Sequence, residues 1–545
     1  MTHGPMVPKS LRVMNLAGFV DQAADRHAGR IAFIWGERTW TWAELNRRIC
    51  AIAYALKTRF GVQKGDRILV QSKNCNQMFE SMFACFRLGA VWVPTNFRQT
   101  PEEVAYQAEV SGAIGMICSA DFPDHQAACE SVVAIRFWIS IGAASFGPDF
   151  DALADDHMGQ RVEVAAVERD DPCWFLFTSG TTGRPKAAVL THGQMTFVVN
   201  NHLCDLMPGT TEADASLVAA PLSHGAGVHQ LTQVARGAAT VLLSSDRLDI
   251  EEAWSLVQTW RISNLFTVPT ILKMMIEHPA VDRYDHSSLR YVIYAGAPMY
   301  RVDQTAALQK LGPVLVQYYG LGEVTGNITV LPPSQHMPDG PLEARSGTCG
   351  FARTGMQICI MTPEGVELPA GQTGEICVVG PAVFAGYYNN PEANENAFRD
   401  GWFRTGDIGH LDRDGFLYIT GRASDMYISG GSNIYPREIE EKLLAHPDIR
   451  EVAVVGVPDP LWGEIGVAVC VFAEGGRMSV QQLGEWLDGK IARYKLPKRY
   501  EFWSELPKSG YGKVAKGLIR NRLLVDSAAL PPSSGGTREG GEPKP

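Results

Sequence analysis

A segment rich in glycines and hydroxyl groups, FTSGTTGRPK, occupies residues 177–186 between two apolar runs and constrains this chain more than any other feature. Glycines let backbone amides approach an anion closely, hydroxyl groups add hydrogen-bond donors, and a lysine supplies compact positive charge. We therefore interpret the segment as a loop that holds phosphate groups, and an ordinary polar hairpin loop is the alternative. The predicted phosphate-binding residues are Thr178, Ser179, Gly180, Thr181, Thr182, Gly183 and Lys186.

The spacing within this segment excludes a Walker P-loop. A P-loop has four residues between its glycines and then Gly-Lys-Ser/Thr at the start of a helix. Here two residues separate Gly180 from Gly183, and Lys186 leads into an apolar run with strand character. The sequence THGQ at residues 191–194 has the spacing of a capping box, which predicts a helix just after that run. The loop should therefore join strand to strand.

Composition limits the class of protein. With 545 residues, 45% apolar and 20% charged, the chain is expected to be a soluble protein of more than one domain. A net charge of -10 without a basic cluster argues against a nucleic-acid partner. The sequence shows neither a secretory signal nor an apolar stretch long enough to span a membrane, so we expect a cytoplasmic protein. Eleven cysteines without a Cys-x-x-Cys pair are typical of buried thiols in a reducing compartment.

Segments with strand and helix periods alternate with glycine and proline turns from Met14 to Leu524, which predicts a mixed α/β fold. A capping box at Thr41 and Glu44 should begin an amphipathic helix, and residues 67–70 should form a buried strand. The spacing of elements changes at residues 421–425. We therefore predict an N-terminal domain at 1–420, a hinge at 421–425, a C-terminal domain at 426–526 and a disordered tail at 527–545.

Three further motifs follow the phosphate loop along the chain. They are QYYGLGE at residues 317–323, WFRTGD at 402–407 and PKSGYGK at 507–513. Together with the loop, these motifs resemble the signatures of the adenylate-forming superfamily, which includes acyl-CoA synthetases, 4-coumarate:CoA ligase, beetle luciferase and peptide synthetase adenylation domains. The resemblance covers nearly the whole chain. It implies an α/β fold with a large multi-layer N-terminal domain, built from α/β subdomains plus a β-rich subdomain, and a small mobile α/β C-terminal domain.

The resemblance also implies roles for single residues. Glu323 should hold Mg²⁺ against a nucleotide phosphate, with a helix cap or a surface salt bridge as the alternative. Asp407 should accept both ribose hydroxyls, with an ordinary turn as the alternative. Lys513 should enter the active site for adenylation, because a carboxylate that attacks a phosphate brings like charges together. Further residues implied to lie against the nucleotide are Gly296, Ala297, Pro298, Tyr319 and Arg422.

Two positions depart from the superfamily pattern. Gly322 stands where the family has a threonine that contacts the α-phosphate. If Thr181 or Thr182 supplies the missing donor, Gly322→Thr should change ATP affinity by less than about tenfold. At the hinge position of the family this chain has Ser424, with Asp425 directly after it. The exact hinge residue between the two domains therefore stays open.

The segment PLSHGAG at residues 221–227 resembles part of the family's acyl pocket. His224 matches the residue beside the reacting carboxylate, and a structural histidine is the alternative. The chain has no aspartate between Pro221 and Leu243, where amino-acid-activating relatives pair the substrate ammonium. This favours an acid without an α-amine. The same segment contains the apolar residues Ala226, Val228 and Leu231. We expect them to contact the acid's tail, so that affinity rises with chain length until the pocket is filled.

Gly430 and Gly431, in the segment GGSNIYP, resemble the loop that lines the pantetheine tunnel of CoA ligases, with a plain turn as the alternative. The sequence thus predicts an ATP-dependent carboxylic acid:CoA ligase that forms an acyl-AMP intermediate from a fatty or other apolar acid. ATP, CoA and the acid are the expected substrates, Mg²⁺ is the expected cofactor, and a homodimer stays open. The alternatives are an adenylation enzyme that passes an aryl or amino acid to a carrier protein, and a non-catalytic acyl- or nucleotide-binding protein.

Overall fold

The structure, a computed structural model, describes residues 10–178, 184–245, 248–297, 299, 301–336, 347–508 and 514–528. Contacts divide the chain into two compact units, Met1–Ile419 and Thr420–Pro545. Several predicted site residues lie outside the described residues, namely Ser179, Gly180, Thr181, Thr182, Gly183, Pro298 and Lys513. No described helix is long and apolar enough to cross a bilayer. The expected burial of the cysteines is confirmed for all but Cys204.

The first sheet of the large unit has six strands in the order β10-β9-β5-β4-β6-β7. β9 through β7 pair in parallel, and β10 is antiparallel to β9 at the edge. The strands are β4 (Arg67–Gln71), β5 (Val91–Pro94), β6 (Gly115–Ser119), β7 (Phe137–Ile141), β9 (Pro172–Thr178) and β10 (Lys186–Thr191). Their near-continuous burial is typical of a parallel sheet that is covered on both faces. The predicted buried strand at residues 67–70 is therefore confirmed.

Helices of this region are α1 (Gly18–His27), α2 (Trp42–Thr58), α3 (Asn76–Leu88), α4 (Pro101–Ser111), α5 (Pro123–Cys129) and α6 (Phe150–Asp156), and β1 (Arg12–Val13) pairs with β8 (Val167–Glu168). The predicted capping box at the start of α2 is confirmed. The Glu44 backbone amide donates to Thr41 Oγ1 over 3.3 Å, and the Thr41 amide donates to the Glu44 carboxylate over 2.8 Å. These two bonds satisfy backbone donors that the first helical turn leaves unpaired.

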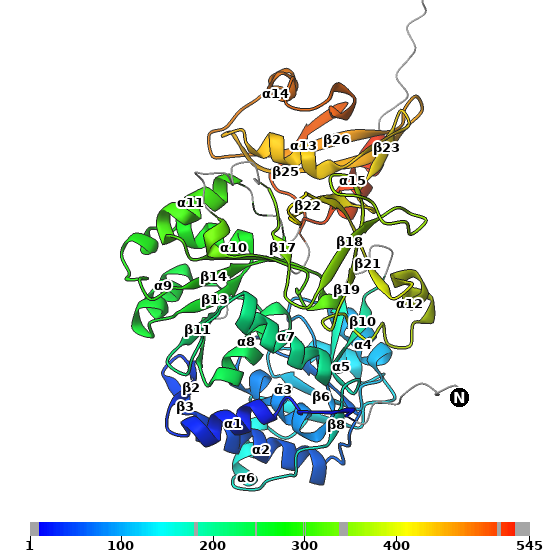
Figure 1. Cartoon of the computed structure of the whole chain (residues 1–545). Coiled ribbons are helices and arrows are strands. Elements are labelled where there is room, and N and C mark those ends of the chain that lie inside the picture. The colour runs from blue at the N-terminus through cyan, green and yellow to red at the C-terminus, as the bar shows by residue number, and fades with distance from the viewer. Residues whose placement is uncertain are drawn as a thin grey trace, which may run out of the picture. The chain divides into compact units, whose positions relative to one another are not determined.

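The second sheet has nine strands in the order β17-β16-β15-β14-β13-β11-β12-β2-β3, and its strands from β15 to β2 are parallel (Figure 1). The strands are β2 (Ile31–Trp35), β3 (Arg38–Thr41), β11 (Ala215–Val218), β12 (Ala239–Leu242), β13 (Asn264–Thr267), β14 (Tyr291–Tyr294), β15 (Leu315–Tyr319), β16 (Thr329–Leu331) and β17 (Phe351–Ala352). Parallel strands end at the same edge of a sheet, and ligands bind outside their carboxyl ends in folds of this kind. That edge is therefore where a site is expected.

The helices of this layer are α7 (His192–Asp205), α8 (Gly225–Arg236), α9 (Ile250–Thr259), α10 (Pro269–Glu277) and α11 (Arg301–Leu311), with short 3₁₀ turns η1 (Pro279–Asp282), η2 (Gly322–Val324) and η3 (Pro333–Gln335). The helix predicted after residues 191–194 is α7, and its capping box between Thr191 and Gln194 is present. The cores formed by both sheets bury large aromatic side chains, among them Trp92, Trp174 and Trp254.

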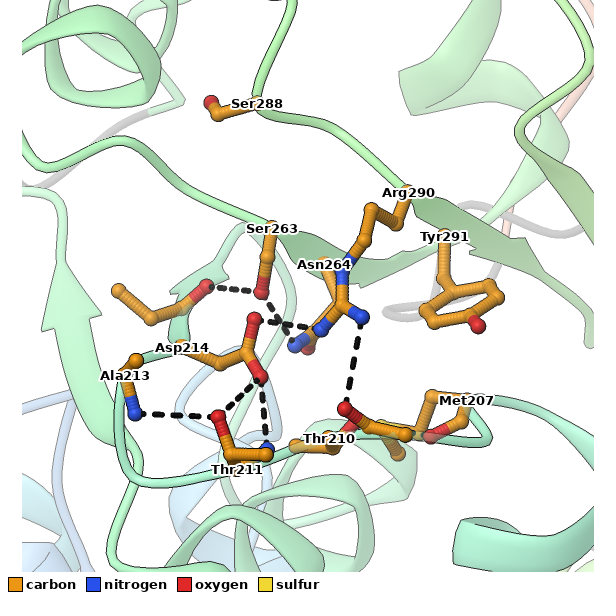
Figure 2. Close-up of polar contacts among 12 residues, drawn as sticks. Met207, Thr210, Thr211, Ala213, Asp214, Ser263, Asn264, Ser288, Arg290 and Tyr291 are labelled. Carbon is orange, nitrogen blue, oxygen red and sulfur yellow. Dashed lines mark hydrogen bonds and ion pairs between the residues drawn. The ribbon is translucent and has the colours of Figure 1, made fainter.

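A polar cluster fixes the loop between α7 and β11, as Figure 2 shows. The Arg290 guanidinium donates to Asp214 Oδ1 over 2.5 Å and to the Gly209 carbonyl over 3.4 Å. Asp214 also accepts from the Thr211 backbone amide over 2.7 Å. Because Arg290 directly precedes β14, these bonds hold the α7–β11 loop against the amino end of the parallel strands. The end of α7 is thereby positioned relative to the sheet.

A β-rich layer completes the large unit. Its five-stranded sheet has the order β18-β19-β21-β20, with β22 paired to β21. The elements are β18 (Gln357–Met361), β19 (Gly374–Val379), α12 (Pro391–Ala397), β20 (Phe398–Arg399), β21 (Trp402–Leu411) and β22 (Leu417–Arg422). The division between the two units falls within β22.

The small unit has a sheet of order β24-β23-β26-β25, with β27 parallel to β26. Its elements are β23 (Tyr427–Ser429), β24 (Ser432–Ile434), α13 (Pro436–Leu444), β25 (Ile449–Asp459), β26 (Gly463–Phe472), α14 (Val480–Leu487), η5 (Arg493–Lys495), β27 (Arg499–Phe502) and α15 (Lys516–Ala528). Helix α15 includes the first two residues of the segment predicted to be a disordered tail. The unit has its own apolar cores on the two faces of its sheet, as expected of a domain.

Candidate active site

The phosphate-loop segment connects two paired strands. Thr178 is the last residue of β9 and Lys186 the first residue of β10, and the two are partners in the antiparallel register. The prediction that the loop joins strand to strand is therefore confirmed. Thr178 and Lys186 are therefore paired at the two ends of the loop segment.

Glu323 lies in η2, directly after β15, and its side chain is nearly buried. Its Oε1 accepts hydrogen bonds from Thr178 Oγ1 over 2.7 Å and from the Tyr387 hydroxyl over 2.9 Å. No described residue donates to Oε2, and within the described residues Glu323 makes no ion pair. The two hydroxyl groups thus hold one carboxylate oxygen, and among the described residues the other oxygen has no donor.

This donor set fits Mg²⁺. Magnesium is usually bound through one or two carboxylates together with water and substrate phosphates, rather than by a cage of protein ligands. The part of the chain that the structure describes contains no group of three or more His, Cys, Asp or Glu residues that could form such a cage. Glu323 would then hold the ion from the protein side, and the nucleotide would supply further oxygens.

Tyr387 was missed by the sequence analysis. Its segment lies between β10 and η2, because the Val189 amide donates to the Gly386 carbonyl over 2.9 Å and the Phe384 amide donates to the Glu323 carbonyl over 2.8 Å. The Tyr387 ring centre lies 5.1 Å from Lys186 Nζ. Burial raises the pKa of Tyr387, so its hydroxyl stays a donor. One side chain thus contacts both the predicted metal ligand and the predicted phosphate-binding lysine.

Replacing Tyr387 by phenylalanine should raise the Mg²⁺ concentration needed for half-maximal pyrophosphate release by about tenfold or more, because a hydrogen bond to a charged group contributes about 1.5 to 3 kcal/mol. The ring beside Lys186 is retained in this variant. Tyr388→Phe is the matched control, since the Tyr388 ring packs on Phe175 and its hydroxyl has no hydrogen-bond partner among the described residues. A similar shift in both variants would show that Tyr387 acts only through packing.

The structure gives a physical reason for Gly322. A Cβ at this position would lie 2.7 Å from Thr178 Cγ2 and 3.0 Å from Leu176 Cδ2. Any side chain would therefore displace Thr178, whose hydroxyl donates to Glu323. The expectation of a less than tenfold change in ATP affinity rests on the missing hydroxyl alone. The close approach of Thr178 adds a steric cost to any side chain at this position.

We now expect Gly322→Thr to lower kcat/KM for ATP by more than about tenfold, since the displaced Thr178 loses its bond to a charged group. The double variant Gly322→Thr with Thr178→Ser removes the clashing methyl group and retains the hydroxyl. It should recover most of the loss in a pyrophosphate-release assay. Equal activity of wild type and the single variant would show that the loop accommodates the added side chain.

Residues predicted to contact the nucleotide gather at the carboxyl edge of the nine-stranded sheet. Tyr319 ends β15, and its hydroxyl donates to Asp407 Oδ2 over 2.6 Å. Burial, together with the nearby Asp407 charge, raises the pKa of Tyr319 well above its usual value, so the hydroxyl remains protonated. Gly296, with φ +83°, and Ala297 follow β14, the parallel neighbour of β15, and both are exposed. The structure thus brings Tyr319 and Asp407 into contact, with the Gly296 turn at the same edge.

His224 is the residue before α8, and its ring is half-buried. Its Nδ1 lies 2.8 Å from Ser223 Oγ. A Cβ on the next residue, Gly225, would lie 2.9 Å from the Phe266 ring and 3.6 Å from the Tyr318 hydroxyl. Two aromatic side chains therefore stand beside the start of α8. The side chains expected to contact the acid's tail, Ala226, Val228 and Leu231, are buried in the main apolar core of the large unit.

In the small unit, Arg422 ends β22, and Gly430 and Gly431 form the two-residue turn between β23 and β24. Their φ values of +56° and +80° are those that such a hairpin turn requires and that glycine adopts readily. A Cβ on Gly430 would lie 2.8 Å from the Trp462 ring. Trp462 is 45% exposed, and Lys498 Nζ lies 5.4 Å from its ring centre. The glycine turn thus lies beside an exposed indole and a cation.

Comparison with known proteins identifies the family. Residues 20–388 match the family described as AMP-binding enzyme, and residues 438–513 match the AMP-binding enzyme C-terminal domain. The chain belongs to the AMP-binding enzyme family. The predicted membership of the adenylate-forming superfamily, in its CoA-ligase branch, is confirmed, as is the α/β fold with a large N-terminal and a small C-terminal domain.

Similar proteins include a feruloyl-CoA synthase from Amycolatopsis sp, 37% identical over 90% of this chain and 95% of that protein. A fatty acid–[acyl-carrier-protein] ligase, ScoC from Streptomyces coeruleorubidus, is 34% identical over 90% of this chain and 93% of that protein. Among solved structures, the o-succinylbenzoate CoA synthetase of Bacillus subtilis in complex with its acyl-adenylate is 30% identical, with a TM-score of 0.80 over 94% of this chain and 98% of that one.

Proposed function

We propose that this protein is an ATP-dependent carboxylic acid–CoA ligase that forms AMP and pyrophosphate. The observation that carries this proposal is Glu323 in an AMP-binding enzyme. One oxygen of its carboxylate accepts hydrogen bonds from Thr178 and Tyr387, and the other has no donor in the part of the chain that the structure describes. Such a carboxylate suits a cation shared with a nucleotide phosphate.

In the first half-reaction, a carboxylate oxygen of the acid attacks the α-phosphorus of ATP. The bond from that phosphorus to the bridging oxygen breaks, pyrophosphate leaves, and an acyl-AMP is formed. We assign the β- and γ-phosphates to the loop that begins at Thr178 and to Lys186, the ribose to Asp407, and the reacting oxygens to Lys513. Bound Mg²⁺ would supply positive charge to the phosphate oxygens. His224 would orient the acid's carboxylate.

In the second half-reaction, the thiol sulfur of CoA attacks the acyl carbon, the bond to the phosphate oxygen breaks, and AMP leaves. We assign the passage for the pantetheine arm to Gly430 and Gly431. Trp462 and Lys498 support CoA as the acceptor, because an exposed indole can stack on an adenine ring and an ammonium group can bind a phosphate. The carrier-protein ligase among the similar proteins makes a protein-bound thiol the competing acceptor.

For the acid, we propose a mainly apolar molecule without an α-amine. An unpaired ammonium is costly to bury, and the segment that follows His224 contains no aspartate to pair with it. Phe266 and Tyr318 stand beside Gly225, next to His224, and would limit the space for an acyl tail. This arrangement favours a compact acid over a long-chain fatty acid. Amino acids should be poor substrates.

The proposal is tested by measuring pyrophosphate and AMP release over a panel of aliphatic, alicyclic, aryl and amino acids, with and without CoA. At least one acid without an α-amine should give CoA-dependent release of AMP and an acyl-CoA product. A preference for α-amino acids over their matched acids, or turnover that needs a carrier protein in place of CoA, would contradict the proposal.

The variant Trp462→Ala tests whether CoA is the thiol acceptor. This variant should raise KM for CoA by about tenfold, which is the scale of losing a ring-stacking contact together with the cation held beside the ring. KM for pantetheine should stay unchanged, because pantetheine lacks the nucleotide. Leu461→Ala is the matched control, since Leu461 is 80% exposed in the same hairpin. Equal changes in KM for CoA and for pantetheine would show that Trp462 does not contact the nucleotide part of CoA.

A further inference from the structure

The turn that follows Glu323 contains a threonine in a strained backbone conformation. The 3₁₀ turn η2 ends at Thr325, whose φ of +49° and ψ of +34° lie in the left-handed region. Among the described residues, four other than glycine have a positive φ, and Thr325 is the β-branched one of the four. Glycine is the usual residue in this conformation at the end of a helical turn. Strain of this kind persists only where the surrounding structure enforces it.

Backbone hydrogen bonds close the turn around Thr325. The Leu321 carbonyl accepts from the amides of Val324 and Gly326, over 3.1 Å each. The Thr325 amide donates to the Gly322 carbonyl over 3.0 Å. The chain thus folds back on η2, and the conformation of Thr325 affects the direction in which the residues of η2 point.

The same turn is packed tightly against the end of β15. A Cβ on Gly326 would lie 2.3 Å from Tyr318 Cε2, and a Cβ on Gly320 would lie 2.5 Å from Gly326 Cα. Real Cβ atoms do not approach other atoms so closely, so only glycine fits at these two positions. The fully buried Arg353 side chain also donates to the Gly326 carbonyl, over 3.4 Å. The turn therefore has little space for another backbone path.

The side chain of Asn327 stabilises the strained residue directly. Asn327 is fully buried, and its Nδ2 donates to the Thr325 carbonyl over 2.8 Å and to Thr325 Oγ1 over 3.2 Å. Thr325 Oγ1 donates in turn to the Val324 carbonyl over 2.7 Å. Buried polar groups are nearly always hydrogen-bonded. Without the Asn327 amide, Thr325 would lose the donor that favours its left-handed conformation.

This turn matters for the proposed metal site because Glu323 lies only two residues before Thr325. The hydroxyl groups of Thr178 and Tyr387 hold one oxygen of the Glu323 carboxylate. They do not fix the backbone from which the side chain starts. That backbone is held by the Phe384 amide, which donates to the Glu323 carbonyl over 2.8 Å, and by the turn. Magnesium demands near-ideal octahedral geometry, so its affinity depends on the direction of each carboxylate ligand.

We propose that Asn327 is a positioning residue for Glu323. Its amide holds Thr325 in the left-handed conformation, and the resulting turn directs the carboxylate toward the cation. This inference rests on the proposed ligase function, in which Glu323 holds Mg²⁺, and adds a residue that acts through the backbone of the site.

The test uses Asn327→Ala, which removes both hydrogen bonds to Thr325. This variant should raise the Mg²⁺ concentration needed for half-maximal pyrophosphate release by about tenfold, because a misplacement of about 1 Å in an active site can cost about 100-fold. Adding Thr325→Gly should restore most of the wild-type Mg²⁺ dependence, because glycine adopts a positive φ without strain and does not need the amide. Thr325→Gly alone should stay close to wild type.

Asn15→Ala is the matched control, because the buried Asn15 amide also donates to two carbonyl oxygens, those of Phe86 and Ala165. It should lower the melting temperature, as Asn327→Ala does, and leave the Mg²⁺ dependence unchanged. If Asn327→Ala alone does not fold, the double variant with Thr325→Gly must fold and show the wild-type Mg²⁺ dependence.

Three results would overturn this inference and leave the ligase function intact. They are an unshifted Mg²⁺ dependence in Asn327→Ala, an equal shift in Asn15→Ala, and a double variant that shifts as far as Asn327→Ala or does not fold. Absence of pyrophosphate release from the wild-type protein with every carboxylic acid would overturn the ligase proposal and this inference with it.

Discussion

Lys513→Ala is expected to lower the rate of acyl-adenylate formation by about 100-fold or more, the scale of losing one group that stabilises charge in the transition state. Thioester formation from a supplied acyl-adenylate should be largely spared. The reason is that like charges meet when a carboxylate attacks the α-phosphate, and this repulsion is absent from the attack of a thiol on the acyl carbon. The two half-reactions are measured separately, by pyrophosphate release and by acyl-CoA formation from synthetic acyl-AMP.

Lys508→Ala is the matched control for this experiment, since Lys508 lies in the same segment and is paired with Glu451. It should retain both half-reactions. An equal loss of both half-reactions in folded Lys513→Ala would show that the lysine does not act in adenylation alone.

Glu323→Gln is expected to lower pyrophosphate release by about 100-fold at saturating Mg²⁺, again the scale of removing one electrostatic contact at the reacting phosphate. The amide keeps the shape of the side chain, and its oxygen can still accept from Thr178 and Tyr387. What is lost is the negative charge that we propose holds the cation. The Mg²⁺ dependence of pyrophosphate release should therefore shift, while the melting temperature should change little.

Glu392→Gln, at an exposed position of α12, is the matched control for charge removal. It should leave the Mg²⁺ dependence unchanged. If Glu323→Gln retains full activity with an unaltered Mg²⁺ dependence, the carboxylate has a structural role and the cation is held elsewhere.

The features predicted correctly from the sequence are those set by local chemistry. The Thr41 capping box and the strand at residues 67–70 depend on near neighbours in the chain, and both are present. The strand-to-strand loop followed from the glycine spacing and from the apolar run after Lys186. The order of motifs was enough to identify the superfamily.

What sequence reasoning could not provide depends on contacts between distant residues. Thr178 and Glu323 are 145 residues apart, and Tyr387 and Glu323 are 64 apart. A lone tyrosine in a turn-rich segment carries no signal of such a bond. Gly322 was interpreted through its missing hydroxyl, although the distance from its backbone to Thr178 is what forbids a side chain.

The acyl site illustrates the same limit. The sequence suggested Ala226, Val228 and Leu231 as contacts for the acid's tail because they are apolar and close to His224. In the structure, these side chains lie in the apolar core. Phe266 of β13 and Tyr318 of β15 belong to the same core, and the sheet brings them beside Gly225 at the start of α8, which the order of residues along the chain does not reveal. The contacts of the acid's tail therefore stay a prediction.

The most direct test of the ligase mechanism is an isotope transfer. An acid that supports turnover is labelled with oxygen-18 in its carboxylate, and the AMP and pyrophosphate formed in the presence of CoA are analysed by mass spectrometry. Attack of the carboxylate on the α-phosphorus predicts one labelled oxygen in AMP, none in pyrophosphate, and an equal amount of acyl-CoA. Label in pyrophosphate or free phosphate, or unlabelled AMP, would contradict the account.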